Sequence, residues 1–309
     1  MKLLDTSAKG VYIIAVTPFT EQGELDLASV PTLIDFYLDA GADGITILGV
    51  LGEAPKLTAD ESRRFVKQVI DSVAGRVPVI VGVSSPGLAA LGELARSSMA
   101  AGAAGVMVAP VPSVRTDDQI FDYFKQVAEI LGDIPFVLQD HPQSTGVQMS
   151  TSVILRILKA TSSCVMVKHE EFPGLAKLSA LRAAGERGEI NRVSILGGNG
   201  GLFLPEELER GADGAMTGFA FPEMMIGVYR AHVAGNAARA RDLFDAYLPI
   251  ARYEQQPGIG LAIRKHILAR RGAIASAALR KPGPKLSAAD LAEIDVMLER
   301  QSQRLKDLG

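Results

Sequence analysis

Short apolar runs alternate with longer amphipathic stretches over the first three quarters of the chain. The short runs are rich in β-branched residues, which is typical of buried strands, and the longer stretches repeat apolar positions at helical spacing. The predicted strands are 12–16, 44–48, 78–83, 105–109, 135–139, 163–168, 192–196 and 214–217. The helices predicted to follow them are 27–40, 58–74, 86–101, 117–131, 150–160, 174–186, 203–210 and 221–234.

A short repeat marks three of the predicted helix-to-strand turns. Residues 40–45, 101–106 and 210–215 share the pattern x-G-A-x-G, in which the first glycine suits a helix end and the second a tight entry into a strand. Eight alternating units with short turns predict parallel strands that close into an α/β fold, the (β/α)₈ TIM barrel. A doubly wound open sheet is the alternative, but no G-x-G-x-x-G follows the first strand, where a dinucleotide site requires it.

The last quarter of the chain has the pattern of helices alone. These helices are predicted at 236–253, 259–270 and 287–305, with a Lys-Pro-Gly-Pro linker at 281–284. The segment is too short for an independent enzyme domain. We therefore predict a barrel over 1–234 and a C-terminal helical extension over 235–309, which packs on the barrel or on a neighbouring subunit.

Composition narrows the class of partner. The net charge is −3, charged residues make up 22% of the chain, and there is no basic block, so we predict a small-molecule partner and no nucleic acid. The single cysteine, Cys164, excludes an intrachain disulfide framework and fits a reducing compartment. No apolar run reaches 18 residues and the N-terminus lacks a long apolar segment, so no membrane partner and a cytoplasmic location are expected.

The sixth predicted strand ends on a lysine. Burying an ammonium group costs several kcal/mol unless its pKa falls, and a neutral amine is a nucleophile. Strand alternation predicts two faces, one with Cys164, Met166, Lys168 and Glu170 and the other with Val165, Val167 and His169. The alternative is that the strand stops at Val167 and Lys168 opens a solvated loop.

Barrel enzymes carry their active sites at the carboxyl ends of the strands, so the residues there form one rim. This position favours a catalytic role for Lys168. The rim also lacks H-x-H, H-E-x-x-H and carboxylate-triad patterns, so neither a metal nor a cofactor is predicted. The predicted catalytic residues are Lys168, Glu170 and Gln139, and the predicted substrate-binding residues are Thr17, Val50, Leu51, Gly52, Asp140, His141, Gly197, Gly198, Asn199 and Thr217.

Several of these motifs together resemble one known family. They are Thr17-Pro18-Phe19, the G-x-x-G-E loop at 49–53, the segment Pro142…Thr145-Gly146, Lys168 and Gly197-Gly198. In this order they resemble the dihydrodipicolinate synthase and N-acetylneuraminate lyase family of Schiff-base barrels, over essentially the whole chain. The resemblance implies that Lys168 forms an iminium with a 2-oxo acid such as pyruvate. It also implies a substrate carboxylate on the backbone of loop 49–53, and a homotetramer.

Three departures from the family pattern concern one proton relay. Two adjacent hydroxyl residues are replaced by Val50-Leu51, the strand-five tyrosine by Gln139, and a tyrosine pair after strand four by Val111-Pro112. This argues against a dihydrodipicolinate synthase or a neuraminate lyase. The chain is more similar to the sugar-acid branch typified by 2-keto-3-deoxy-L-arabinonate dehydratase, with Q-D-x-P at 139–142, K-x-E at 168–170 and M-T-G at 216–218.

The resemblance thus implies dehydration of a 2-keto-3-deoxy sugar acid. Glu170 would exchange the C3 proton or protonate the leaving hydroxyl, or it would only form an ion pair that orients Lys168 or a neighbouring arginine. Gln139 would hydrogen-bond a substrate hydroxyl or a water, and Asp140 could instead cap a turn. The glycine turn at 197–199 would approach the substrate tail or be only a turn, and Thr217 would touch the carboxylate end or only close the barrel. The alternatives are a pyruvate-dependent aldolase or dihydrodipicolinate-synthase-like enzyme, and a non-catalytic keto-acid-binding barrel.

Overall fold

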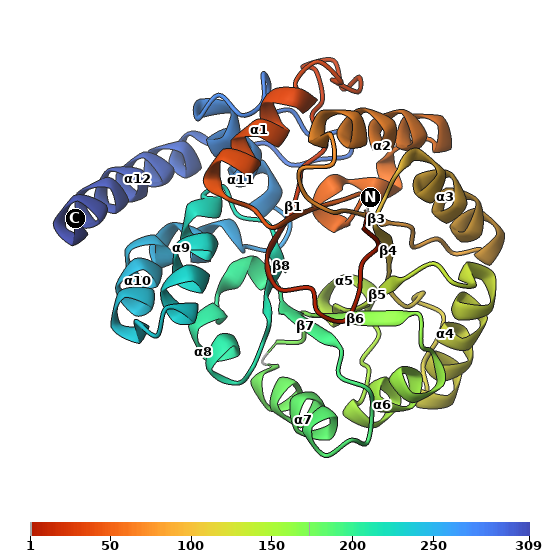
Figure 1. The fold of residues 1–309 in the computed structure, drawn as a ribbon. Coiled ribbons are helices and arrows are strands. Elements are labelled where there is room, and N and C mark those ends of the chain that lie inside the picture. Colours follow the sequence, from red (N-terminus) through yellow and green to blue (C-terminus); the bar gives the residue numbers. More distant parts are fainter. Residues whose placement is uncertain (1, 173) are drawn as a thin grey trace.

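Eight parallel strands form a closed barrel in the computed structural model, which describes residues 2–172 and 174–309 (Figure 1). Each strand pairs in parallel with the next, and β8 pairs with β1, so the sheet has no free edge. The predicted TIM barrel is therefore confirmed. The strands are β1 (Gly10–Ile14), β2 (Gly44–Ile47), β3 (Val79–Gly82), β4 (Gly105–Val108), β5 (Phe136–Asp140), β6 (Cys164–His169), β7 (Ser194–Gly197) and β8 (Gly214–Thr217).

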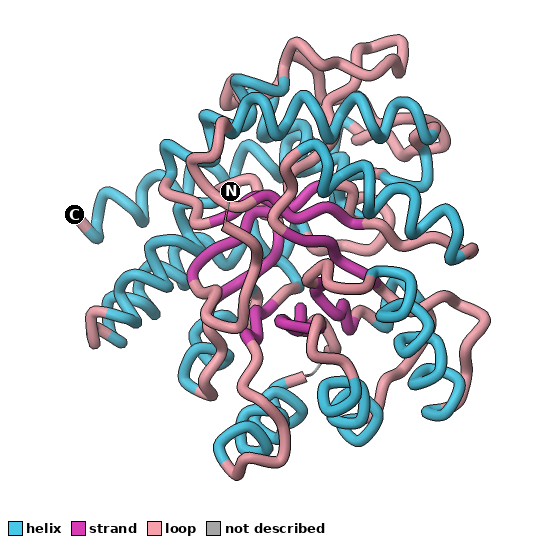
Figure 2. Tube along the Cα trace, turned by 45° about the vertical axis from the view of Figure 1, so that its right-hand side comes forward, coloured by secondary structure: helices cyan, strands magenta, loops and turns pink. Residues whose placement is uncertain are grey.

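A ring of helices surrounds the strands (Figure 2). Its members are α1 (Val30–Ala40), α2 (Ala59–Val73), α3 (Leu88–Ala101), α4 (Asp117–Leu131), α6 (Thr151–Ala160), α7 (Leu175–Glu186), α8 (Leu204–Glu209) and α9 (Pro222–Val233). Thr58 caps α2 through a capping box with Glu61, as its sequence predicts. The first glycine of the repeat ends α1 and α3 in the left-handed conformation, with φ of 100° at Gly41 and 109° at Gly102.

Four single-turn elements lie in the loops that follow the strands. They are η1 (Val50–Gly52), η2 (Ala54–Lys56), α5 (Pro142–Thr145) and η3 (Asn199–Gly201). None was predicted, because an element of three or four residues is too short to show a period. All four lie at the carboxyl end of the barrel, where they shape the rim.

A bulge changes which residues of β6 face the barrel interior. The register between β5 and β6 shifts between Phe136 and Val137. As a result Val165 and Met166 both belong to the inner cluster of apolar side chains, and Cys164 packs in the outer cluster, between strands and helices. The prediction that Cys164 shares a face with Lys168 was therefore wrong.

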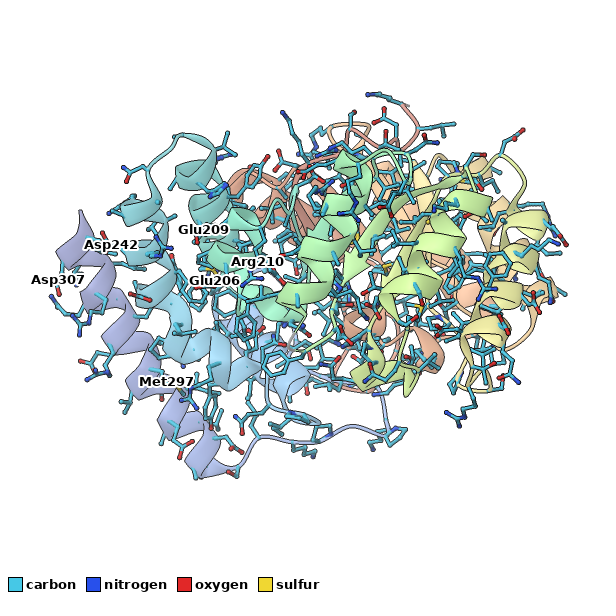
Figure 3. All side chains as sticks on the ribbon, turned by 90° about the horizontal axis from the view of Figure 1, so that it is seen from below. Glu206, Glu209, Arg210, Asp242, Met297 and Asp307 are labelled. Carbon is cyan, nitrogen blue, oxygen red and sulfur yellow. The ribbon has the colours of Figure 1, made fainter. Side chains whose placement is uncertain are left out.

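The C-terminal segment forms three helices, α10 (Ala237–Glu254), α11 (Gly260–Arg270) and α12 (Ala288–Leu308). Figure 3 shows α12, with Met297 and Asp307, at the outer edge beside α10, which carries Asp242. The outer apolar cluster of the barrel continues into α10, α11 and α12. The division at residue 234 stays a prediction. No helix in the described part of the chain is long and apolar enough to cross a membrane.

Buried charges tie this C-terminal segment to the loop after β2. Lys265 of α11 is fully buried, and its Nζ donates to Glu53 Oε1 at 2.7 Å. Arg280 donates to both carboxylate oxygens of Glu61, each at 2.7 Å, and its backbone N–H donates to Glu53. Breaking a buried ion pair typically costs about 3–5 kcal/mol, so the Lys265–Glu53 pair holds the loop that contains η1 and η2 in place. The Arg280–Glu61 pair is partly exposed and contributes less.

Candidate active site

A cavity opens at the carboxyl ends of the strands, and Lys168 lies in its wall. Its lining comes from the ends of β1, β6 and β8, from the loops after β2, β5 and β7, from the residue that follows α10, and from α11. The lining residues are Ile14, Val50, Leu51, His141, Lys168, Glu170, Asn199, Gly200, Thr217, Gln255 and Arg264. Seven of the thirteen predicted site residues therefore meet in one cavity.

Lys168 and Glu170 form a buried pair inside this cavity. Lys168 is 2% exposed and its Nζ donates to Glu170 Oε2. Burial lowers the pKa of Lys168, although the attraction of Glu170 opposes this shift. Burial alone would raise the pKa of Glu170, but Lys168 and His141 lower it below its ordinary value. The pair therefore places an ionised carboxylate against an amine that is more easily deprotonated than a solvated lysine.

Gln139 and His141 converge on the same carboxylate oxygen. Gln139 Nε2 donates to Glu170 Oε2 at 2.8 Å, and His141 Nδ1 lies 3.7 Å from that oxygen. His141 Nδ1 is also 2.8 Å from Ser144 Oγ. Burial lowers the pKa of His141, which favours the neutral imidazole. Gln139 thus holds Glu170 from behind the cavity wall, while His141 lies between Glu170 and the partly exposed loop at α5.

Asn199 lines the cavity, whereas Gly197 and Gly198 lie beside it. Both positions require glycine, because neighbouring side chains leave no room for a Cβ. A Cβ at Gly197 would clash with Glu207, and one at Gly198 would clash with Glu170. Asn199 Nδ2 donates to the backbone carbonyl of Glu170 at 3.1 Å. The glycine turn therefore allows β7 to approach Glu170 and Glu207 closely, and neither of its first two glycines lines the cavity.

Two predicted threonines act on the loops of the rim. Thr17 Oγ1 donates to the carbonyl of Gly52 at 2.6 Å, so Thr17 braces the η1 loop, and neither residue lines the cavity. Thr217 does line it, and its hydroxyl accepts the N–H of Gly200 at 2.9 Å. Val50 and Leu51 present apolar side chains to the cavity from the same η1 loop.

Asp140 points away from the cavity, into the wall between the strands and the helices. Its Oδ2 accepts a hydrogen bond from Lys177 Nζ at 2.9 Å and lies 3.3 Å from His169 Nδ1. His169 Nε2 is 2.8 Å from the carbonyl of Gly174. The predicted substrate-binding residue Asp140 therefore lies outside the cavity, and its carboxylate belongs to a buried cluster behind β6. Asp140 is the last residue of β5, and alternation turns it to the face opposite Gln139.

Glu207 is buried in the same region, and its burial predicts how the stability of the protein depends on pH. Burial raises its pKa to about 8, so the folded state retains a proton that the unfolded chain loses above its ordinary value of 4.5. The free energy of unfolding should therefore fall as the pH rises from about 5 to 8 and level off above that, by at most roughly 1.4 kcal/mol per pKa unit.

In Glu207→Gln the side chain stays neutral. We expect its urea midpoint to exceed that of the wild type by a margin that widens between pH 5 and 8, with Glu206→Gln as the control. A margin independent of pH would contradict this account.

Arg264 and Gln255 are site residues that were not predicted. Arg264 enters the cavity from α11, and Gln255 enters it from the residue that follows α10; the sequence pattern assigned both to the extension. One signal was available in the sequence. Arg264 and Lys265 stand between Ile263 and Ile267 in a helix with no separate polar face, and charged side chains in such a position need buried partners. In the described part of the chain, His, Cys, Asp and Glu side chains form no group of three or more that could hold a metal ion.

The chain matches the dihydrodipicolinate synthetase family over residues 7–301. It is 32% identical to the L-2-keto-3-deoxyarabonate dehydratase of Azospirillum brasilense over 298 residues, 94% of each chain. It is also 30% identical to the 4-hydroxy-tetrahydrodipicolinate synthase of Thiobacillus denitrificans, covering 79% of this chain and 81% of that one.

Solved structures show the same architecture. A dihydrodipicolinate synthase from Rhodopseudomonas palustris is 50% identical, with a TM-score of 0.95 over 97% of this chain and all of that one. YagE, a prophage protein of the dihydrodipicolinic acid synthase family from E. coli K12 in complex with pyruvate, is 25% identical. Its TM-score is 0.86 over 95% of this chain and 98% of that one.

Proposed function

The chain belongs to the dihydrodipicolinate synthetase family, and from this premise we propose that it is a Schiff-base dehydratase of a 2-keto-3-deoxy sugar acid. The observation that carries the proposal is the ion pair of Lys168 with Glu170, buried in a cavity at the catalytic end of a TIM barrel. Two further points support it, the similarity to a sugar-acid dehydratase and the departures from the family's hydroxyl relay.

The chemistry begins with attack of the neutral Lys168 amine on the C2 ketone. The carbonyl oxygen leaves as water, and the resulting iminium withdraws electrons from C3. Loss of a C3 proton gives an enamine, whose electron pair then expels hydroxide from C4. The proton and the hydroxide leave together as water, and a second water hydrolyses the iminium to restore the amine. No cofactor is required for this balance.

Glu170 is the group that exchanges the C3 proton in this scheme. Its carboxylate lies beside Lys168, and Gln139 fixes one oxygen by a hydrogen bond. His141, close to that oxygen and bonded to Ser144, passes the proton onward to the leaving hydroxyl or to solvent. Glu170 and His141 thus replace the family tyrosines, and Gln139 acts as a positioning residue.

Carbon–carbon chemistry on the same lysine is the second candidate. The 50% identity to a structure described as a dihydrodipicolinate synthase favours it. Aldol cleavage would use the same iminium but would break the C3–C4 bond instead of the C4–O bond. A non-catalytic barrel that binds a keto acid is the third reading, and it gives no product at all.

Product analysis separates the three readings. Incubation with 2-keto-3-deoxy pentonates and hexonates should give a product that keeps every carbon atom and is 18 mass units lighter, because one water is lost. Release of pyruvate and a shorter aldehyde would show aldol cleavage and overturn the dehydratase proposal. Absence of turnover with all stereoisomers would favour the binding barrel.

The other sequence-based predictions are part of the same proposal. We propose a homotetramer, which sedimentation can test, and a small 2-oxo acid as the partner. Pyruvate is the first probe, since the related YagE was solved in complex with it. The cytoplasmic location and the absence of a cofactor stay predictions.

A further inference from the structure

Arg264 reaches the catalytic cavity from the C-terminal helix α11. It is 2% exposed, and one edge of its guanidinium is held by Glu254 of α10. Its Nε donates to Glu254 Oε1 at 2.5 Å, and Nη2 lies 2.5 Å from the same oxygen. The other oxygen of Glu254 accepts the backbone N–H of Ala220 at 3.0 Å. Glu254 therefore fixes the orientation of Arg264 within the cavity wall.

The opposite edge of the guanidinium is bare. Nη1 is buried and has no hydrogen-bond partner among the described residues. A Cβ added to Gly218 would lie 2.8 Å from Nη1, 2.8 Å from the carbonyl of Ile14 and 2.9 Å from Leu51 Cδ1. Nη1 thus lies close to the ends of β1 and β8 and to the η1 loop. A buried guanidinium N–H without an acceptor is costly, which indicates a position for an anionic ligand.

We propose that Arg264 binds the carboxylate of the 2-oxo acid, alongside the η1 loop. This inference rests on the proposed function for the nature of the substrate. Guanidinium and carboxylate match in shape and charge, and their hydrogen bonds are among the strongest in proteins. Val50 and Leu51 have no hydroxyl groups to offer the carboxylate, and Arg264 supplies donors beside Leu51.

If Arg264 binds the substrate carboxylate, its loss weakens the binding of acids more than that of other carbonyl compounds. A purely structural arginine would not make this distinction. Arg264 also lowers the pKa of Lys168 by like-charge repulsion, so its loss affects attack on every carbonyl compound. Recognition of the carboxylate affects acids alone. A change in folding or in the reactivity of Lys168 alters the half-saturating concentrations of an acid and of its carboxylate-free analogue alike. The ratio of these two concentrations therefore reports on binding of the carboxylate alone.

The experiment compares borohydride trapping of pyruvate with trapping of acetone, in which a methyl group replaces the carboxylate. The test variant is the double substitution Arg264→Gln and Glu254→Gln, which leaves no unpaired buried charge. Arg271→Gln, in an arginine that pairs with Glu223 outside the cavity, is the matched control. We expect the half-saturating pyruvate concentration, relative to that of acetone, to rise about 10- to 100-fold in the double variant. It should change little in the control. An unchanged ratio would overturn the proposal.

Lactate distinguishes failure of this inference from failure of the proposed function, because it carries the carboxylate but cannot form an iminium. It should raise the melting temperature of the wild type and of Lys168→Met, but not that of the double variant. If no adduct forms on Lys168 and lactate still protects through Arg264, the Schiff-base proposal fails and the carboxylate site stands. Equal protection of the double variant would refute the carboxylate site.

Discussion

A Lys168→Met variant is expected to lose turnover of its sugar-acid substrate by on the order of 10⁴-fold or more, the loss typical when a covalent nucleophile is removed. Methionine fills the space of the lysine stem but has no amine. The variant should also form no borohydride-stable adduct with pyruvate. Steady-state turnover and intact-protein mass spectrometry check the two results.

Lys168→Arg is the matched control for charge. It keeps a cation beside Glu170, but its guanidinium stays protonated and cannot form the iminium. We expect it to be folded, by near-ultraviolet circular dichroism, and inactive. More than about 1% of wild-type turnover in either variant would contradict the nucleophilic role of Lys168, since that role demands a far larger loss.

The second large effect is expected from Glu170→Gln. The amide has nearly the same shape but cannot take a proton from C3, so dehydration should fall by about 10²- to 10⁴-fold. Trapping of pyruvate should persist, because Schiff-base formation needs only the amine. Single-turnover measurements with the sugar acid, beside trapping with pyruvate, separate the two steps.

The pH dependence of trapping in Glu170→Gln gives an independent check. Trapping becomes faster as the pH rises through the pKa of Lys168. In the wild type, burial lowers this pKa and the attraction of Glu170 opposes the shift. Without the carboxylate the rise should move to lower pH. Glu171→Gln is the control, because Glu171 pairs with Lys177 outside the cavity. It should leave the rate of dehydration and the pH dependence of trapping unchanged. Loss of trapping in Glu170→Gln would instead assign Glu170 to the formation of the iminium.

The barrel was predictable because the apolar periodicity, the helix caps and the glycine turns all indicate the same alternation of strands and helices. Apolar periodicity marks each strand, Thr58 caps α2, and the repeated glycines end α1 and α3. Predicted and observed bounds differ by only a few residues. The bulge in β6 was not predictable, since a one-residue shift in pairing leaves no mark on a strand that is apolar on both faces. It moves Cys164 to the outer face and leaves Lys168 facing the cavity.

The site was predictable where residues follow a strand and share its face. Lys168 and Glu170 are two residues apart, so alternation alone brings them together. Asp140 lies outside the cavity for the same reason, since it is next to Gln139 and turns to the opposite face. Arg264 lies almost one hundred residues beyond Lys168 in a separate helix, and its arrival depends on how α10 and α11 pack against the barrel. Such a contact has no local pattern in the sequence.

The central claim is an iminium on Lys168, and the most direct measurement is to find it. The wild-type protein is mixed with pyruvate, reduced with borohydride, digested and mapped by peptide mass spectrometry. This account predicts a single stable adduct on Lys168, absent from Lys168→Met. An adduct on another lysine, or none with pyruvate and every 2-keto-3-deoxy acid tried, would contradict the Schiff-base mechanism and favour a barrel that only binds its ligand.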